Sequence, residues 1–244
     1  MRNFVIISII IAYAFIGCKP EEVKEVSLTE NLSVSAKLIH SDNFDHDLSN
    51  WLVEQMPNGS VELRDGKMEV NDAGGCTVWF KPKLKGPTMI EYDAHLIQKG
   101  GEYDRVSDLN CFWMASDHTH HDKLFANSDF RQGRFPNYDS LSLYYVGMGG
   151  HHNTKTRFRK YLGTGEKPLL PQYDLTDKQY LLTPNTTVKI RLIAYDGIIQ
   201  YYRDGRLIFD YRDDNPYTEG NFGLRTVHNH MTLDNFKVYQ LKGI

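Results

Sequence analysis

Three Asp-Gly dipeptides, at residues 65–66, 196–197 and 204–205, separate short runs in which apolar and polar residues alternate. Asp-Gly is typical of the two-residue turn that joins neighbouring antiparallel strands, and a period of two is typical of a half-buried strand. The segment VELRDGKMEV therefore predicts a hairpin over residues 61–70, and residues 189–213 predict three consecutive strands. A chain built in this way is expected to form antiparallel sheets.

Further runs of the same kind follow along the chain. They are rich in Val, Ile, Tyr, Phe and Thr, which favour strands, and they lie at residues 88–97, 111–116, 140–148, 155–161, 222–227 and 233–241. Only residues 123–127 suggest a short helical turn. We therefore predict an all-β fold, a two-sheet antiparallel jelly-roll sandwich.

The N-terminus has the character of a targeting segment. Arg2 precedes a short apolar run that ends in Phe15-Ile16-Gly17-Cys18. A small residue before a cysteine at this place resembles the lipobox of bacterial lipoproteins, which implies cleavage after residue 17 and lipidation of Cys18. We predict a signal peptide at 1–17, a charged tether at 18–38 and a jelly-roll domain at 39–244. The expected location is the outer membrane, at the cell surface or its periplasmic face, with the membrane reached through the lipid alone.

Composition narrows the partners. The chain has 244 residues, 41% of them hydrophobic, and a net charge of -3. This is enough for one domain with a sizeable core, and the charge argues against a nucleic-acid partner. Beyond Cys18, the only cysteines are Cys76 and Cys111, which show no metal-ligand spacing. They could pair in an oxidising compartment or stay buried as small apolar residues.

The alternation also assigns side chains to faces. In residues 140–148, Leu141, Leu143 and Tyr145 share one side of the expected strand, and Ser142 and Tyr144 share the other. In the next strand Arg157, Arg159 and Tyr161 share a side. We predict one apolar face and one polar, basic and aromatic face, which would suit a polysaccharide. The alternative is that the arginines only decorate a solvated surface.

The sequence GGHHNTKTRFRKY places two imidazoles beside this face. Paired histidines, arginines and tyrosines suit β-elimination on a uronic acid, which needs a cation on the carboxylate, a base and an acid. Our first hypothesis is therefore a lyase acting on a uronic-acid-containing polysaccharide or oligosaccharide. Its predicted catalytic residues are His152 as the base, His151, Tyr144 and Tyr145; its predicted substrate-binding residues are Trp113, Asn153, Arg157, Arg159, Arg225 and His228.

Two other function classes stay open. A non-catalytic surface glycan-binding protein would use the same aromatic and basic groups. A glycoside hydrolase could use Glu91 and Asp93, which share a strand face with His95 in part of an E-x-D-x-x-E pattern whose third acid is missing. The histidine-rich residues 118–122 show no recognised metal spacing, so no metal or other cofactor is predicted. Calcium stays open as an alternative, although no acidic loop specifies it.

With these residues in view, the segments FWMAS, GRFPNYDSLSLYY and RFRK resemble the YesU-like family of bacterial proteins. The resemblance covers residues 44–240. It implies a concanavalin-type jelly roll, similar to lamin-G-type lectins and keto-disaccharide hydrolase domains, and a context of rhamnogalacturonan or other polysaccharide use. The segment GGHHN has no counterpart in it, so the resemblance assigns no catalytic residue there.

Overall fold

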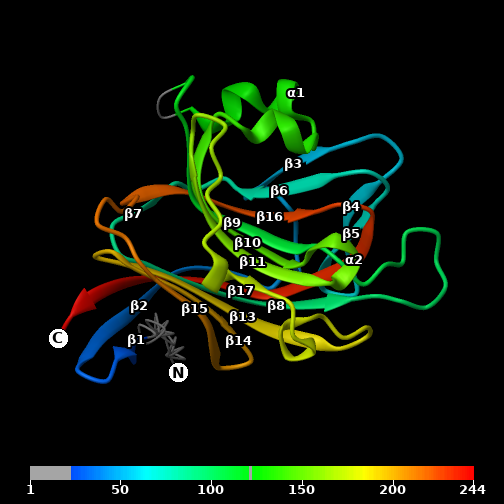
Figure 1. Ribbon diagram of the computed structural model, residues 1–244. Helices are drawn as coiled ribbons and strands as arrows, with labels where there is room; N and C mark the ends of the chain where they lie inside the picture. The colour runs from blue at the N-terminus through cyan, green and yellow to red at the C-terminus, as the bar shows by residue number, and fades with distance from the viewer. Residues whose placement is uncertain (1–22, 121–122) are drawn as a thin grey trace, which may run out of the picture.

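The computed structural model describes residues 23–120 and 123–244, and it consists mainly of two antiparallel sheets packed face to face (Figure 1). The nine-stranded sheet has the order β1 (Val23–Thr29), β2 (Leu32–Asp42), β17 (Asn229–Gly243), β8 (Thr88–Leu96), β13 (Thr187–Tyr195), β14 (Ile198–Arg203) and β15 (Arg206–Arg212). In the same sheet β5 (Lys67–Asp72) pairs with β17 and with β4 (Ser60–Arg64).

The eight-stranded sheet has the order β12 (Asp174–Leu175), β11 (Lys155–Leu162), β10 (Leu141–Gly149), β9 (Leu109–Asp117), β16 (Glu219–Thr226), β6 (Cys76–Phe80) and β3 (Trp51–Gln55), with β7 (Leu84–Lys85) beside β16. The helical pieces are short: η1 (Leu124–Asn127), α1 (Ser128–Arg131), η2 (Phe135–Tyr138), α2 (Gly150–Asn153), η3 (Pro171–Tyr173) and η4 (Lys178–Tyr180). The predicted all-β two-sheet sandwich is confirmed.

The predicted Asp-Gly turns lie between the expected strands. Asp65 and Gly66 have φ angles of 52° and 67°, and they join β4 to β5. The turns at residues 196–197 and 204–205 have the same left-handed geometry and join β13, β14 and β15. Two consecutive positive φ angles define the turn whose twist matches that of the flanking strands, and Gly adopts them without steric strain.

The core lies between the two sheets, where alternate side chains of both meet. Its large members include Trp51, Phe80, Tyr92, Trp113, Tyr144, Phe158 and Phe236. The rings of Trp51 and Phe236 lie 4.9 Å apart at an interplanar angle of 71°, a favourable edge-to-face contact across the sandwich. Aromatic rings from distant parts of the chain thus hold the sheets together.

Residues 23–38 differ from the predicted tether. They form β1 and the first part of β2, and β1 folds back across the outer side of the nine-stranded sheet. There Val26 and Leu28 pack with Met89 and Ile193 in a second apolar cluster. Gln200 Nε2 donates to the Leu28 carbonyl oxygen at 3.0 Å. The tether prediction rested on charged residues, but the alternation of charged and apolar residues here is that of an amphipathic strand.

The signal peptide at 1–17, Cys18 and residues 18–22 of the tether lie outside the described residues. Nowhere in residues 23–120 and 123–244 is there a helix with the length and apolar character needed to cross a bilayer.

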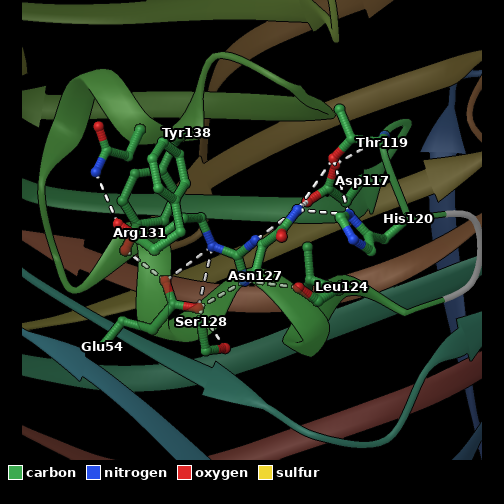
Figure 2. A network of polar contacts seen from close by, with 11 residues as sticks. Glu54, Asp117, Thr119, His120, Leu124, Asn127, Ser128, Arg131 and Tyr138 are labelled. Atoms are coloured by element: carbon green, nitrogen blue, oxygen red, sulfur yellow. Dashed lines mark hydrogen bonds and ion pairs between the residues drawn. The ribbon is translucent and has the colours of Figure 1, made fainter.

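A long connection between β9 and β10 lies over the outer side of the eight-stranded sheet and carries η1, α1 and η2 (Figure 1). A buried polar network fixes it to β3 and β9 (Figure 2). Arg131, which is 0% exposed, donates from Nη2 to Glu54 Oε1 at 2.6 Å and from Nη1 to Asp117 Oδ2 at 3.3 Å. Tyr138 also donates to Glu54, at 2.6 Å.

The two cysteines of the domain are unpaired and buried. Cys76 lies in β6 and Cys111 in β9, and neither takes part in a disulfide. Burial raises the pKa of the Cys111 thiol to about 12, and burial also raises the pKa of Cys76. Of the two alternatives left open by the sequence, the structure has the small apolar core residues.

We predict that Cys76 and Cys111 do not react with a thiol reagent such as dithionitrobenzoate in the native protein, because the reactive species is the thiolate and both groups are buried. The measurement uses a Cys18→Ser variant, in which these are the only thiols. Both should react after unfolding in guanidinium. Rapid reaction of either thiol under native conditions would contradict the placement.

Replacing Arg131 by Met should strongly destabilise the protein, because Glu54 and Asp117 would remain buried without their cation. Breaking a buried ion pair from one side typically costs about 3–5 kcal/mol. Urea unfolding measures the loss. The matched control is Arg134→Met in the same connection, where the side chain is exposed and little change is expected. Equal stability of the two variants would show that the network does not hold the connection.

Replacing Leu28 by Ala should cost about 2–5 kcal/mol of unfolding free energy if β1 packs as described, since a buried leucine leaves a cavity. Glu25→Ala, at an exposed position of the same strand, is the control and should have little effect. Thermal or urea unfolding compares the two. Wild-type stability in the Leu28 variant would restore the tether interpretation.

Candidate functional site

The outer side of the eight-stranded sheet is hollowed into a cavity of about 400 Å³. The basic side chains that line it are Arg157, Arg159, Lys167 and Arg225. The aromatic ones are Phe135, Tyr145 and Tyr161, and the other polar ones include Asp108, Asn110 and His151. Cations and rings thus converge here from the three strands β10, β11 and β16 and from two connections.

One row of the cavity follows directly from strand register. Arg225 of β16 lies opposite Asn110 of β9, Asn110 lies opposite Gly147 of β10, and Gly147 lies opposite Arg157 of β11. Neighbouring strands are about 4.8 Å apart, so the backbones of Arg225 and Arg157 are separated by roughly 14 Å across the sheet. The row is long enough to meet more than one sugar ring.

The next row adds rings. Tyr145 lies opposite Phe112 of β9 and Arg159 of β11. Its phenol extends over Gly147, where a Cβ atom would lie 2.4 Å from the phenol oxygen, so this position has no room for a side chain. Burial raises the pKa of Tyr145 well above its usual value. The hydroxyl therefore stays protonated and can donate a hydrogen bond.

The four cations are held in different ways. Arg157 donates to Asp174 Oδ1 at 2.8 Å and is thereby neutralised. The Lys167 ammonium pairs with Asp139 and lies 5.0 Å from the centre of the Phe135 ring. Arg159 donates to the Lys167 carbonyl oxygen.

Two of the guanidinium groups have no carboxylate at ion-pair distance. Of the three arginines that line the cavity, Arg159 and Arg225 have no ion pair with a described carboxylate. Arg225 donates to neutral oxygens, the Gly133 carbonyl at 2.6 Å and Thr77 Oγ1 at 3.2 Å. Their positive charge is thus available to an anionic ligand.

Acidic groups are scarce in the cavity. Within the described part of the chain, Asp108 is the one acidic residue of the lining. Its carboxylate receives a hydrogen bond from Arg105 Nη2 at 2.7 Å and another from Ser107 Oγ at 2.6 Å. The cavity therefore has a positive balance and lacks a pair of free carboxylates.

The tandem histidines occupy an unusual turn. His151, His152 and Asn153 all have left-handed backbone angles, with φ of 53°, 57° and 59°. His151 Nε2 lies 2.7 Å from Arg157 Nη1. Because a guanidinium only donates, Nε2 accepts this bond and its lone pair is engaged. His152 is exposed and is not part of the lining, and Asn153 bonds the backbone of Leu182 at 2.8 and 2.9 Å.

Like His152 and Asn153, three further predicted site residues are not part of the lining. Trp113 and Tyr144 point into the sandwich core, where Tyr144 donates to Asp213 at 2.7 Å. His228 lies beside the cavity-lining Val227, but its ring contacts Tyr103 and the Ala73 carbonyl. We therefore exclude all three from the site.

The predicted grouping of side chains by alternation is confirmed in both strands, but the side of Leu141, Leu143 and Tyr145, expected to be the apolar face, is the side of the arginines. Tyr145 lies on the side of Arg157, Arg159 and Tyr161, and Tyr144 faces the core. Leu141 and Leu143 share the side of Tyr145, but the β9–β10 connection covers them with Leu124 and Tyr138. The covered part of an outer sheet face carries apolar side chains, just as the core face does. Alternation alone could therefore not show which side of the strand faces the core.

Glu91, Asp93 and His95 do share a strand face, on the outer side of the nine-stranded sheet and so away from the cavity. They adjoin two other hollows, of about 550 and 260 Å³, where Glu91 pairs with Lys24 at 2.6 Å and with Arg191 at 2.8 Å. Burial opposes its ionisation, but the two cations outweigh burial and lower the pKa of Glu91. A glycosidase acid needs the opposite shift.

No candidate metal site occurs in the part of the chain that the structure describes. Within residues 23–120 and 123–244, no three His, Cys, Asp or Glu side chains are grouped to hold an ion. Part of the histidine-rich segment, residues 121–122, lies outside the described residues.

Sequence reasoning missed several residues of the lining. Asp108 and Asn110 lie just before the predicted strand at 111–116, and extending its alternation backwards would have placed Asn110 beside Phe112. Phe135 and Lys167 come from connections, and no pattern in the sequence shows that these fold over the sheet.

Solved structures share this architecture. A protein of unknown function with a galectin-like fold from Bacillus subtilis is 15% identical with a TM-score of 0.68, covering 91% of this chain and 100% of the other. The carbohydrate-binding module CBM66 from Bacillus subtilis is 15% identical with a TM-score of 0.53, covering 78% and 96%. An endo-β-1,3-glucanase from Pyrococcus furiosus is 12% identical with a TM-score of 0.56, covering 93% and 100%. At such identities the likeness shows the fold alone.

No curated protein is a significant match to this sequence. The resemblance to the YesU-like family remains a prediction, because the matching family model is a different one. That model, described as a domain of unknown function, covers residues 70–236, which run from β5 into β17 and include every residue of the cavity. The chain therefore belongs to the DUF6250 family.

Proposed function

We propose that the cavity binds an acidic saccharide, with a carboxylate-bearing sugar such as a uronate at Arg159, whose guanidinium has no carboxylate partner among the described residues. The observation that carries the proposal is the convergence of basic and aromatic side chains around a hollow with one acidic residue. An arginine fork matches a carboxylate, and aromatic faces pack against the C–H surfaces of sugars.

The fold supports a saccharide ligand. Several proteins of similar structure are carbohydrate-binding by name, including the module CBM66 and the Emp46p carbohydrate recognition domain. Others are glucanases, such as the enzyme from Pyrococcus furiosus. Fold alone does not decide function, so the argument rests on the cavity itself.

Binding is better supported than elimination, the first hypothesis from the sequence. Elimination needs a base beside the sugar, and the lone pair of His151 Nε2 is already engaged by Arg157. The Tyr145 hydroxyl stays protonated, so it suits the role of an acid more than that of a base. His152, the predicted base, is not part of the lining.

Hydrolysis through paired carboxylates has less support at this place. A retaining or inverting glycosidase needs two carboxyl groups on either side of the scissile bond. Asp108 stands alone in the described lining and is held by Arg105. Glu91 and Asp93 belong to the other sheet. We therefore propose a glycan-binding role, and we retain lipid anchoring at Cys18 as a prediction about how the site is displayed.

The wild-type protein should bind polygalacturonate saturably, and Arg159→Gln should weaken binding about tenfold or more, because a charge-assisted hydrogen bond contributes about 1.5–3 kcal/mol. Binding should also weaken as salt is raised. Isothermal titration calorimetry measures both effects. The matched control is Arg212→Gln on β15, an exposed arginine outside the lining, which should bind like the wild type.

Incubation of the wild-type protein with a panel of acidic polysaccharides tests for elimination. Ultraviolet absorbance of unsaturated uronate products, formed from pectic, ulvan-like or gum substrates, would show lyase activity and overturn the purely binding role. Unaltered affinity in Arg159→Gln, or no binding of any acidic glycan by the wild type, would refute the proposed site.

A further inference from the structure

Two buried polar atoms at the floor of the cavity have no hydrogen-bond partner. They are the Asn110 side-chain oxygen Oδ1 and the Arg225 Nε–H group. The two side chains are 3% and 1% exposed, they line the cavity, and they lie directly opposite each other on β9 and β16. An unpaired buried polar group costs about 1–3 kcal/mol, so two neighbouring ones indicate a place where a ligand completes the bonding.

The surroundings fix the orientation of both groups. Asn110 Nδ2 donates to Asp108 Oδ1 at 3.4 Å, and a carboxylate only accepts, so the amide nitrogen faces Asp108 and Oδ1 faces away. Asp108 is in turn held by Arg105 and Ser107. On Arg225, Nη1 is used by Thr77 and Gly133, which leaves Nε free.

One donor beside one acceptor is the complement of a hydroxyl group, which accepts one hydrogen bond and donates another. A carboxylate or a sulfate only accepts and would leave Asn110 Oδ1 unpaired. We infer that Asn110 and Arg225 recognise a single hydroxyl of the bound sugar, while Arg159 holds its anionic group. This inference rests on the proposed function and narrows its ligand to a sugar that carries both groups.

Phe135 covers this floor. Its ring lies 5.3 Å from the Arg225 guanidinium carbon and is 36% exposed, at the end of the connection that Arg131 anchors. The apolar ring shields the donor and the acceptor from bulk water. Hydrogen bonds are stronger in such a shielded site than in water, so a missing hydroxyl costs more binding free energy there.

The experiment compares wild type with Asn110→Leu, which removes the acceptor at similar volume. The probes are methyl α-D-galacturonide, its monodeoxy derivatives and inorganic sulfate, titrated by calorimetry. In the wild type, removal of one particular hydroxyl should weaken binding about tenfold, as expected for one hydrogen bond in a buried site. Asn110→Leu should weaken binding of the parent uronide by a similar factor and show no further loss with that deoxy derivative.

Sulfate should bind wild type and Asn110→Leu equally, because it uses only the cations. Asn31→Leu, at an exposed position in the β1–β2 turn, is the control and should bind every probe as the wild type does. Equal losses for each deoxy derivative in wild type and Asn110→Leu would overturn the hydroxyl assignment and leave acidic-saccharide binding intact. Failure of the wild type to bind any uronide would overturn both.

A second readout needs no ligand. If Asn110 Oδ1 is unpaired in the free protein, Asn110→Leu should unfold at the same temperature as wild type or higher, since an unsatisfied buried acceptor has been removed. The variant also loses the long 3.4 Å hydrogen bond from Asn110 Nδ2 to Asp108, so Asp108→Asn in the wild-type and Asn110→Leu backgrounds measures that contribution. A clearly lower unfolding temperature beyond that contribution would show that Oδ1 already has a structural partner, such as a fixed water, and would overturn the assignment whatever the protein binds.

Discussion

The buried contact of Arg131 with Glu54 and Asp117 is the interaction on which the site depends. A sheet face by itself is open and shallow. The connection between β9 and β10 gives it depth, and this connection has little regular structure to hold it in place. Its buried Arg131 reaches β3 through Glu54 and β9 through Asp117, so that one cation joins two strands that are not neighbours. Phe135 follows four residues later and closes over the floor of the cavity.

The two outer faces of the sandwich have different electrostatics. On the nine-stranded sheet the carboxylate of Glu91 has cations on both sides, and Lys67 pairs with Asp234. On the eight-stranded sheet Arg159 and Arg225 have only neutral partners at hydrogen-bond distance among the described residues. This difference is the electrostatic basis for placing the proposed anionic ligand on the eight-stranded sheet.

The sequence predicted local structure well because turns and alternation are local properties. The Asp-Gly turns and the strands at 88–97, 140–148 and 155–161 are confirmed in kind and nearly in extent. The shared side of Arg157 and Arg159 followed from the same periodicity. The fold class was predictable for the same reason.

What could not be predicted is the packing of non-local segments. Tyr144 and Tyr145 are chemically identical neighbours, and which one faces the core depends on where the second sheet lies. The indole of Trp113 is a side chain that commonly stacks on sugars, but in this fold it is buried between the sheets. Residues 23–38 have the charged composition of a tether, and only their packing against the outer side of the nine-stranded sheet shows that they are strands. The left-handed backbone at His151 and His152 could not be predicted either, because such angles are uncommon for any residue other than glycine.

That turn has a consequence for evolution and engineering. Each non-glycine residue in it costs about 1–2 kcal/mol relative to a relaxed backbone, and the two Asn153 contacts with Leu182 help to hold it. Glycine at position 152 would relax the loop and leave the neighbouring imidazole at 151 less firmly aimed at Arg157. The histidine pair therefore lowers the stability of the fold but keeps the His151 ring oriented toward Arg157. Selection for thermal stability alone would favour glycine in this turn.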